Sequence, residues 1–395
     1  MCKLAGQMVS WWIVVAMAMT VFKHDGVDGV FTETCSSTSS NCNALVSYTA
    51  PANSTLAKVA ALFGVSDIDS LLGANDFNLS TPATLALSPG DFLKVPVTCN
   101  CINGTRQSNS TIYKVKAGDS LSLIAETTYQ GLITYQQIGA ANGIVDLNKI
   151  QIGQLLVIPF PCGCNRVSDQ PVVYLAYPVQ SGDRIANISA DFGAQMADVL
   201  SLNGIANASD LQVGSVLEVP IPACQASFLN SSIDSGLLVA EGGYELTAAK
   251  CVQCICTDAP QLRCIPTPTS FSKACLGSLQ CANSSLTIGN FTASPSSTGC
   301  DVTSCNYEGF TQGNTIISRV VNSTENQCPV MASLTYDYPA PIGTYPVPPA
   351  APTPGPTSSA SGAPAPAPAT NPSSASFCIP SLMSFLVPLV LAIYL

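Results

Sequence analysis

The chain has 395 residues, only 10% of which are charged, and its formal net charge is −10. This length allows two to four domains, and an acidic chain without a basic run is a poor candidate for binding nucleic acid. The single histidine, His24, lies in the leader described next, so the rest of the chain lacks the side chain that Ser-His-Asp and Cys-His enzymes and most catalytic zinc sites require.

The N-terminus carries an apolar run from Met8 to Phe22, which follows Lys3. The run is shorter than the ~20 residues of a membrane span and has the length of a signal-peptide core. Small residues follow it, and Val27-Asp28-Gly29 suits cleavage. We therefore expect residues 1–29 to be a signal peptide, with an uncleaved anchor as the alternative.

Three segments then repeat the same sequence markers. Asn75, Asn142 and Asn203 stand near the middle of the three segments, 67 and 61 residues apart. The second and third segments open with Tyr-x-Val-x-x-Gly-Asp, the first opens with a weaker form of this pattern at Tyr48, and all three close with a glycine and a run that ends in Val-Pro or Ile-Pro. Recurrence at this spacing predicts three copies of one structural unit. We place them at residues 47–97, 112–160 and 174–221.

The middle segment gives the expected order of elements. Ile112 to Val115 alternates polar and apolar residues and predicts a strand, after which Gly118-Asp119 predicts a turn in which Asp119 caps a helix. Thr134-x-x-Gln137 predicts a capping box at the start of a second helix, which we expect to bury Ile138 and Ala141 and to end at Asn142-Gly143, where glycine accepts a left-handed conformation. Leu155 to Ile158 predicts the last strand. The unit is therefore strand, helix, helix, strand.

Cysteine usage indicates a disulfide framework. Of 18 cysteines, Cys2 lies in the leader and Cys378 in the C-terminal tail, which leaves 16 in a secreted chain. Two Cys-x-Cys pairs separate the three repeats, and ten cysteines fall between residues 224 and 328. We expect residues 224–332 to form a separate cysteine-rich module of strands and loops. A zinc site at the Cys-x-x-Cys of Cys251 and Cys254 is the alternative.

The chain also carries ten Asn-x-Ser/Thr sequons, a density that agrees with the secretory pathway and an exposed, glycosylated surface. The asparagines are Asn53, Asn78, Asn103, Asn109, Asn187, Asn207, Asn230, Asn283, Asn290 and Asn322.

The C-terminal part changes character. Residues 338–376 are rich in Pro, Ala and Ser, which favours polyproline II and predicts a stalk. An apolar run from Leu382 to Leu395 ends the chain, and no Lys or Arg follows Arg319. Small residues before a terminal apolar run form the pattern of a GPI signal, with Ser373 or Ser374 as the attachment residue and residues 374–395 as the propeptide. A tail-anchored span is the alternative, although the run is short for one.

These features together resemble a known family. The strand-helix-helix-strand repeat with Tyr-x-Val-x-x-Gly-Asp at its front and Gly-x-x-Leu-x-Val/Ile-Pro at its back resembles the LysM module. With the Cys-x-Cys linkers, the cysteine-rich module and the GPI-type terminus, the chain resembles the plant LysM domain-containing GPI-anchored proteins, which are receptor-like proteins for chitin or peptidoglycan. The resemblance extends over roughly residues 35 to 330 and is weakest in the first repeat. It implies an α+β fold of three tandem βααβ LysM modules stapled by disulfides, followed by a cysteine-rich β/loop module and a Pro-rich stalk.

The resemblance also implies a disulfide pairing and a binding groove. The implied disulfides are Cys35–Cys101, Cys42–Cys164 and Cys99–Cys162; the sequence alone leaves the pairing of these six cysteines open. In LysM proteins the sugar lies between the loop after the first strand and the loop before the last strand, here called the first and second lips. The implied positions are Ala117, Gly118, Asp119 and Ser120 against Asn148, Lys149, Ile150 and Gln151 in the second repeat, and Ser181, Gly182, Asp183 and Arg184 against Ser209 to Gln212 in the third.

The sequons rank the three repeats as binding sites. The first repeat carries Asn53 on its first lip and Asn78 later, and the third carries Asn187 in its first helix and Asn207 near its second lip. The second repeat has no internal sequon, since Asn109 lies just outside it. Because a glycan beside a shallow groove would obstruct a polysaccharide, we expect the second repeat to be the main site, unless the other sequons are unoccupied or point away.

We therefore expect a receptor or co-receptor on the outer face of the plasma membrane that binds polysaccharides containing N-acetylglucosamine, either chitin or peptidoglycan, with no catalytic residue, cofactor or metal. A GPI-anchored chain has no cytosolic part, so the resemblance implies that it triggers innate immunity through a LysM receptor kinase. The alternatives are a wall-associated glycan-binding protein that does not signal, and a wall hydrolase with paired carboxylates, for which the repeats leave no catalytic domain.

Overall fold

The computed structural model describes residues 33–328, apart from residues 37, 39, 165–166, 269–278, 298 and 313–314. The expected signal peptide, stalk and GPI signal, with Ser373 and Ser374, lie outside the described residues. Within the described part, every helix is too short or too polar to cross a membrane.

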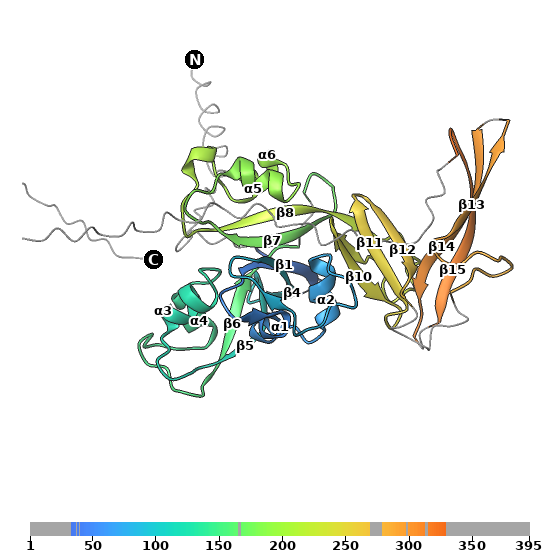
Figure 1. The fold of residues 1–395 in the computed structure, drawn as a ribbon. Helices are drawn as coiled ribbons and strands as arrows, with labels where there is room; N and C mark the ends of the chain where they lie inside the picture. The colour runs from blue at the N-terminus through green and yellow to red at the C-terminus, as the bar shows by residue number, and fades with distance from the viewer. Residues whose placement is uncertain are drawn as a thin grey trace, which may run out of the picture. The chain divides into compact units, whose positions relative to one another are not determined.

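Each of the three repeats has the order strand, helix, helix, strand (Figure 1). The first repeat consists of β1 (Cys42–Thr49), β2 (Ser54–Thr55), α1 (Leu56–Phe63), α2 (Ile68–Ala74), β3 (Ala86–Leu87) and β4 (Phe92–Ile102). The second consists of β5 (Thr105–Lys114), α3 (Leu121–Leu123), the π-helix η1 (Ile124–Thr128), α4 (Tyr135–Ala141) and β6 (Leu155–Pro161). The third consists of β7 (Val172–Pro178), α5 (Ile185–Asp191), α6 (Met196–Leu202), the 3-10 helix η2 (Ala208–Asp210) and β8 (Val216–Gln225).

All three repeats contribute their strands to one sheet, in the order β6-β5-β4-β1-β7-β8-β9. The strands of each repeat pair antiparallel, whereas β1 and β7 pair parallel, with Val46 beside Ala176. Side chains alternate between the two faces of a strand. Val46 therefore joins the core of the first and second repeats, while its neighbour Leu45 joins the core of the third. The helices of the first and third repeats consequently lie on opposite faces of the shared sheet.

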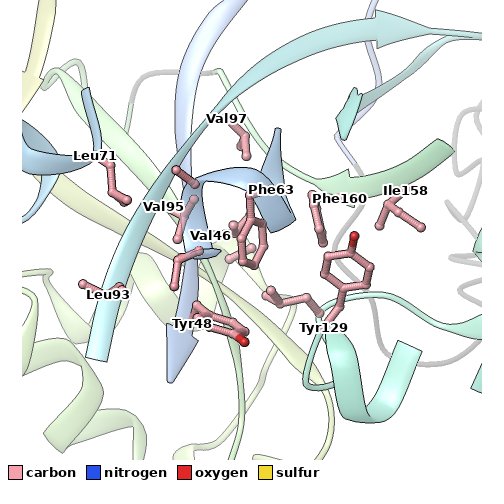
Figure 2. Packing of buried hydrophobic residues seen from close by; sticks show 14 of the residues in the cluster. Val46, Tyr48, Phe63, Leu71, Leu93, Val95, Val97, Tyr129, Ile158 and Phe160 are labelled. Carbon is pink, nitrogen blue, oxygen red and sulfur yellow. The ribbon is translucent and has the colours of Figure 1, made fainter. Parts of the chain in front are cut away.

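The first and second repeats share a hydrophobic core (Figure 2). The ring of Phe63, from α1, lies 5.2 Å from the ring of Tyr48, 5.7 Å from Tyr129 and 5.4 Å from Phe160, centroid to centroid. These four side chains come from both repeats, and edge-to-face aromatic contacts add to the stabilisation that burial provides. The two repeats are therefore packed against each other and are not independent modules joined by a linker.

The structure confirms only some of the helix ends that the sequence predicts. Thr134 and Gln137 form the predicted capping box, and Gly143 adopts the predicted left-handed conformation with φ of +64°. The prediction for Asp119 was wrong, because Ser120 caps α3 and its Oγ accepts a hydrogen bond from the Leu123 amide at 3.1 Å. Ile138 is buried as predicted, but Ala141 is exposed.

The recurring asparagines have a common structural task. In the second repeat, the Asn142 side chain accepts a hydrogen bond from the Val157 amide and donates one to the Val157 carbonyl, each at 2.8 Å. Asn75 does the same for Lys94, and Asn203 for Glu218. Each asparagine thus ties the second helix of its repeat to the last strand and satisfies backbone groups at that strand's open edge.

The six cysteines of the repeats are joined as Cys35–Cys101, Cys42–Cys164 and Cys99–Cys162, the pairs that the family resemblance implies. The first ties the segment before β1 to β4, the second ties the start of β1 to the linker after β6, and the third ties β4 to the same linker. Such cross-links stabilise a small repeat chiefly by restricting the unfolded chain.

The cysteine-rich part contains strands and loops in its described residues. Its strands are β9 (Leu238–Ala240), β10 (Gly243–Thr247), β11 (Val252–Asp258), β12 (Gln261–Pro266), β13 (Phe291–Ser296), β14 (Gly299–Phe310) and β15 (Ile316–Glu325). Cys251 and Cys254 are both disulfide-bonded, Cys254 to Cys264, which leaves no thiolate for the alternative zinc site. The hydroxyl of Tyr244 on β10 donates a hydrogen bond to the Phe77 carbonyl at 2.7 Å, which fastens this part to the first repeat.

Candidate binding groove

The two lips of the second repeat rise from one hydrogen-bonded base. The Val115 amide donates to the Gln154 carbonyl at 2.9 Å, and the Gly153 amide donates to the Val115 carbonyl at 2.8 Å. The first lip leaves the end of β5 just after Val115, and the second lip arrives just before Gly153. The structure therefore brings together the two sets of residues that the resemblance assigns to the sugar.

The first lip is a tight turn held by Asp119. Its Oδ2 accepts a hydrogen bond from the Lys116 amide at 2.7 Å and another from the Tyr113 hydroxyl at 2.9 Å. Burial, reinforced by the hydrogen bond to Asp119, raises the pKa of Tyr113 to about 12, so the phenol stays a donor. Gly118 has φ of +89°, and open space surrounds the position that its Cβ would take. The carboxylate thus fixes the turn; the Asp119 amide is bonded to the Lys116 carbonyl and the Ser120 carbonyl accepts from the Ile124 amide, while Ala117 and Gly118 are exposed at the tip.

The second lip is held from within in the same way. Asp146 accepts hydrogen bonds from the Asn148 amide at 3.2 Å and the Lys149 ammonium at 2.9 Å, and the latter lowers the pKa of Asp146. The Gln151 amide donates to the side-chain oxygen of Gln154 at 3.0 Å. Asn148 and Lys149 are exposed, whereas Ile150 packs partly against the core and offers an apolar surface.

The third repeat reproduces this geometry. Its lips share a base in which the Val179 amide donates to the Ser215 carbonyl at 2.9 Å, and Asp183 Oδ2 accepts from the Gln180 amide at 2.7 Å. Burial and then the charge of Asp183 raise the pKa of Tyr177. Gly182 has φ of +96°, and Ser181 and Arg184 are exposed beside it. On the second lip, Asp210 accepts hydrogen bonds from the Ser209 hydroxyl at 3.3 Å and the Asn207 side chain at 3.2 Å, so this sequon belongs to the lip itself.

The first repeat departs from this arrangement because its lips are bonded to each other. β2 on the first lip pairs with β3 on the second, Ser54 beside Leu87 and Thr55 beside Ala86. Two further backbone bonds run from the Leu56 amide to the Leu85 carbonyl and from the Ala57 amide to the Ala83 carbonyl. In the fully described lips of the other two repeats, no backbone hydrogen bond joins residues 116–123 to 143–151 or residues 180–184 to 205–212. Backbone groups that could bind a sugar are therefore already used in the first repeat.

Sequence reasoning missed both the tyrosine–aspartate bond and the closed lips. A signal for the bond exists in the spacing, since Tyr113 and Asp119 are six residues apart, as are Tyr177 and Asp183. The closed lips carry no comparable marker beyond the absence of Gly-Asp from the first repeat. Among the described residues, the sulfur atoms of Cys42, Cys99 and Cys164 are grouped closely enough to hold a metal ion, but all three are bound in disulfides. The open lips of the second repeat can offer backbone groups and apolar side chains such as Ile150 and Val145 to a neutral ligand.

Comparison with known proteins identifies the family of the repeats. The family model described as LysM domain matches residues 113–159 and 177–220, which are the second and third repeats. The chain is 38% identical over 302 residues to LysM domain-containing GPI-anchored protein 3 of Arabidopsis thaliana, covering 75% of this chain and 70% of that protein. It is 40% identical over 305 residues to LysM domain-containing GPI-anchored protein LYP4 of Oryza sativa subsp. japonica, covering 75% of each. It is 34% identical over 279 residues to the chitin elicitor-binding protein of the same rice, covering 70% of this chain and 76% of that protein.

Proposed function

Because the chain belongs to the family of plant LysM domain-containing GPI-anchored proteins, we propose that it is a cell-surface receptor for polysaccharides that contain N-acetylglucosamine. The observation that carries the proposal is the open pair of lips on the second repeat, where Asp119 and Asp146 hold exposed backbone in place. An acetamide group has one donor and one acceptor, which loop carbonyls and amides can match, and its methyl group can contact Ile150. An analogue without the acetamide would leave those groups unpaired, which gives specificity.

The main site is the second repeat. Its lips are open and free of sequons, whereas the first repeat has bonded lips and the third carries Asn187 on α5 and Asn207 on its second lip. One shallow groove binds weakly, and a polymer that reaches several copies on one membrane binds far better through effective concentration.

Chitin is the ligand class we favour, supported by the similarity to a protein named for chitin elicitor binding; peptidoglycan shares the acetamide and remains the second candidate. The location is the outer face of the plasma membrane, through a GPI anchor attached at Ser373 or Ser374. Such a chain has no cytosolic part, so it signals innate immunity by presenting its ligand to a LysM receptor kinase. A wall-associated protein that binds without signalling is the competing function.

Isothermal titration of the purified ectodomain with chitin oligomers and with peptidoglycan fragments tests the proposal. Saturable binding to at least one polymer is expected, with no cleavage products. Asp119→Ala loosens the first lip of the second repeat and should weaken binding about tenfold, or ~1.4 kcal/mol, while its matched control Asp183→Ala in the third repeat should change binding little. A folded, cross-linked ectodomain that bound neither polymer would refute the receptor, and an equal loss in both variants would refute the ranking.

A further inference from the structure

Each repeat has an inner sheet face, covered by its own helices, and an outer face on the opposite side. In the second repeat, Tyr113 and Leu156 point inward and are buried, and the alternate residues point outward. The outer face therefore presents Ile112 and Val157, which are paired across β5 and β6, next to the pair of Lys114 and Leu155. Ile112 is 49% exposed and Leu155 is 65% exposed, so two large apolar side chains of neighbouring strands lie bare on this face.

The outer faces of the other two repeats are covered. The positions that match Ile112 and Val157 are Ser47 and Lys94 in the first repeat, each 3% exposed. In the third repeat they are Ala176 and Glu218, each fully buried. The third repeat covers the outer face of the first, where the Phe92 ring lies 5.6 Å from the Phe192 ring of the third. The first repeat in turn covers the outer face of the third, because Ala176 and Val216 of the third belong to the core of the first.

This mutual covering has the geometry of a twofold pair. The first strands β1 and β7 run parallel, and the helices of the two repeats lie on opposite faces, which is what a twofold axis along the strands produces. Burial alone would favour apolar side chains on the covered faces and charged side chains on the bare face, but the opposite is found. Two ionisable residues, Lys94 and Glu218, are buried in the pair, while the equivalent Val157 and its apolar neighbours lie on the repeat that has no pair.

We propose that the outer face of the second repeat is a self-association surface that receives the second repeat of another copy of this chain. A βααβ repeat is what covers this face in the two other cases, and the three repeats of residues 33–328 leave none within that part of the chain to cover the second. A second copy carries the same apolar face, so the contact can be isologous and closed. The contact uses side chains rather than an added strand, because Asn142 already occupies the amide and carbonyl of Val157. Attachment to one membrane would raise the effective concentration of such a weak contact.

Sedimentation equilibrium of the glycosylated ectodomain over a wide concentration range, without ligand, tests the proposal. Glycosylated protein is required because the Asn109 sequon lies on the same strand as Ile112. The wild type is expected to show a reversible monomer–dimer equilibrium. Leu155→Glu puts a carboxylate into an apolar contact, where removing its charge from water costs free energy, and should weaken the equilibrium about tenfold or more. The matched control is Val213→Glu, since Val213 is 67% exposed in the third repeat but lies outside this face.

A photo-crosslinking residue at position 112 gives a second measurement that does not depend on the variants folding equally. Crosslinks to position 112 or 155 of another copy are expected. A wild type that remains monomeric at every concentration, or an equal weakening by both glutamate variants, would overturn the proposal. Crosslinking on cells to a different protein, without any between copies, would overturn it as well by assigning another occupant to the face.

Discussion

The first and second repeats have the same order of elements but use their surfaces in opposite ways. In the first repeat the two lips are bonded through β2 and β3, the outer face is buried by the third repeat, and the Phe77 carbonyl, just after α2, accepts a hydrogen bond from Tyr244 of the cysteine-rich part. In the second repeat the lips are separate and the outer face is bare. The same fold therefore has both surfaces closed in one copy and both open in the other, and the loops and surface residues rather than the fold make this difference.

The largest expected effect comes from closing the open groove. The double substitution Lys149→Asn with Gln151→Thr creates a sequon on the second lip of the second repeat. A glycan there would occupy the space that the polysaccharide needs, and we expect loss of detectable binding, a drop of about a hundredfold or more. Titration with chitin oligomers measures it. Lys149→Asn alone is the control, because it changes the side chain without adding a glycan; equal loss in both would point to the lysine instead.

The recurring asparagines give the next largest effect, now on stability. Asn75→Ala and Asn142→Ala each leave an amide and a carbonyl of the last strand without their partner. At Lys94 these groups lie under the buried face of the first repeat, whereas at Val157 water can reach the strand edge. We expect Asn75→Ala to lower the free energy of unfolding by about 3 kcal/mol and Asn142→Ala by about 1 kcal/mol.

Urea unfolding with intact disulfides measures both variants. Equal losses of unfolding free energy would show that water does not take the place of the asparagine side chain in the second repeat. They would contradict the view that the outer face is covered in the first repeat and bare in the second.

The βααβ units could be predicted because their signals are local. Thr134 and Gln137 meet within one turn of helix, and Gly143 is needed wherever a helix ends in a left-handed residue. The distribution of the units over one sheet could not be predicted. The pairing of Val46 with Ala176 joins residues 130 positions apart, and which face each covers depends on a register that no single segment specifies.

In the candidate groove, too, the features that depend on nearby residues could be predicted, and those that depend on distant pairing could not. The resemblance assigned residues 117–120 and 148–151, and their turns are built from bonds within a few residues, such as Asp119 to Lys116. The capping role of Asp119 was wrong because a neighbouring serine was equally able to cap, and only the turn geometry decides between two adjacent oxygen-bearing side chains. The closed lips of the first repeat depend on the pairing of β2 with β3, and 30 residues lie between Thr55 and Ala86.

The buried face of the third repeat predicts a pH effect that the second repeat lacks. Burial, and then the charge of Glu33, raise the pKa of Glu218 to about 8. Between its ordinary pKa and 8 the folded protein therefore binds more protons at this site than the unfolded chain. Stability contributed by this group is present at low pH and is lost as the pH rises toward 8, by at most about 1.4 kcal/mol per pH unit.

Thermal or urea unfolding at pH values from 5 to 8 measures this dependence. Glu218→Gln should flatten it, and the difference between the two proteins isolates this group from Glu245, whose pKa burial also raises, to about 7. Identical pH profiles would mean that Glu218 ionises in the fold as freely as in the unfolded chain, and the covered outer face would not be dry.

The smallest expected effect tests whether a glycan on Asn187 is the reason that the third repeat binds chitin oligomers more weakly than the second. Both have open lips and a first-lip aspartate that accepts a backbone amide, but Asn187 lies exposed on α5 of the third. Asn187→Gln removes that glycan, and in the protein whose second repeat is blocked at Lys149 we expect residual affinity for chitin oligomers to rise about threefold, or ~0.6 kcal/mol. Mass spectrometry of the unchanged protein establishes occupancy, and Asn322→Gln on β15 is the matched control. If an occupied Asn187 were removed without any gain, the two repeats would differ through their lip side chains, Arg184 and Ser209 against Ser120 and Asn148, and the sequons would lose their role in ranking the sites.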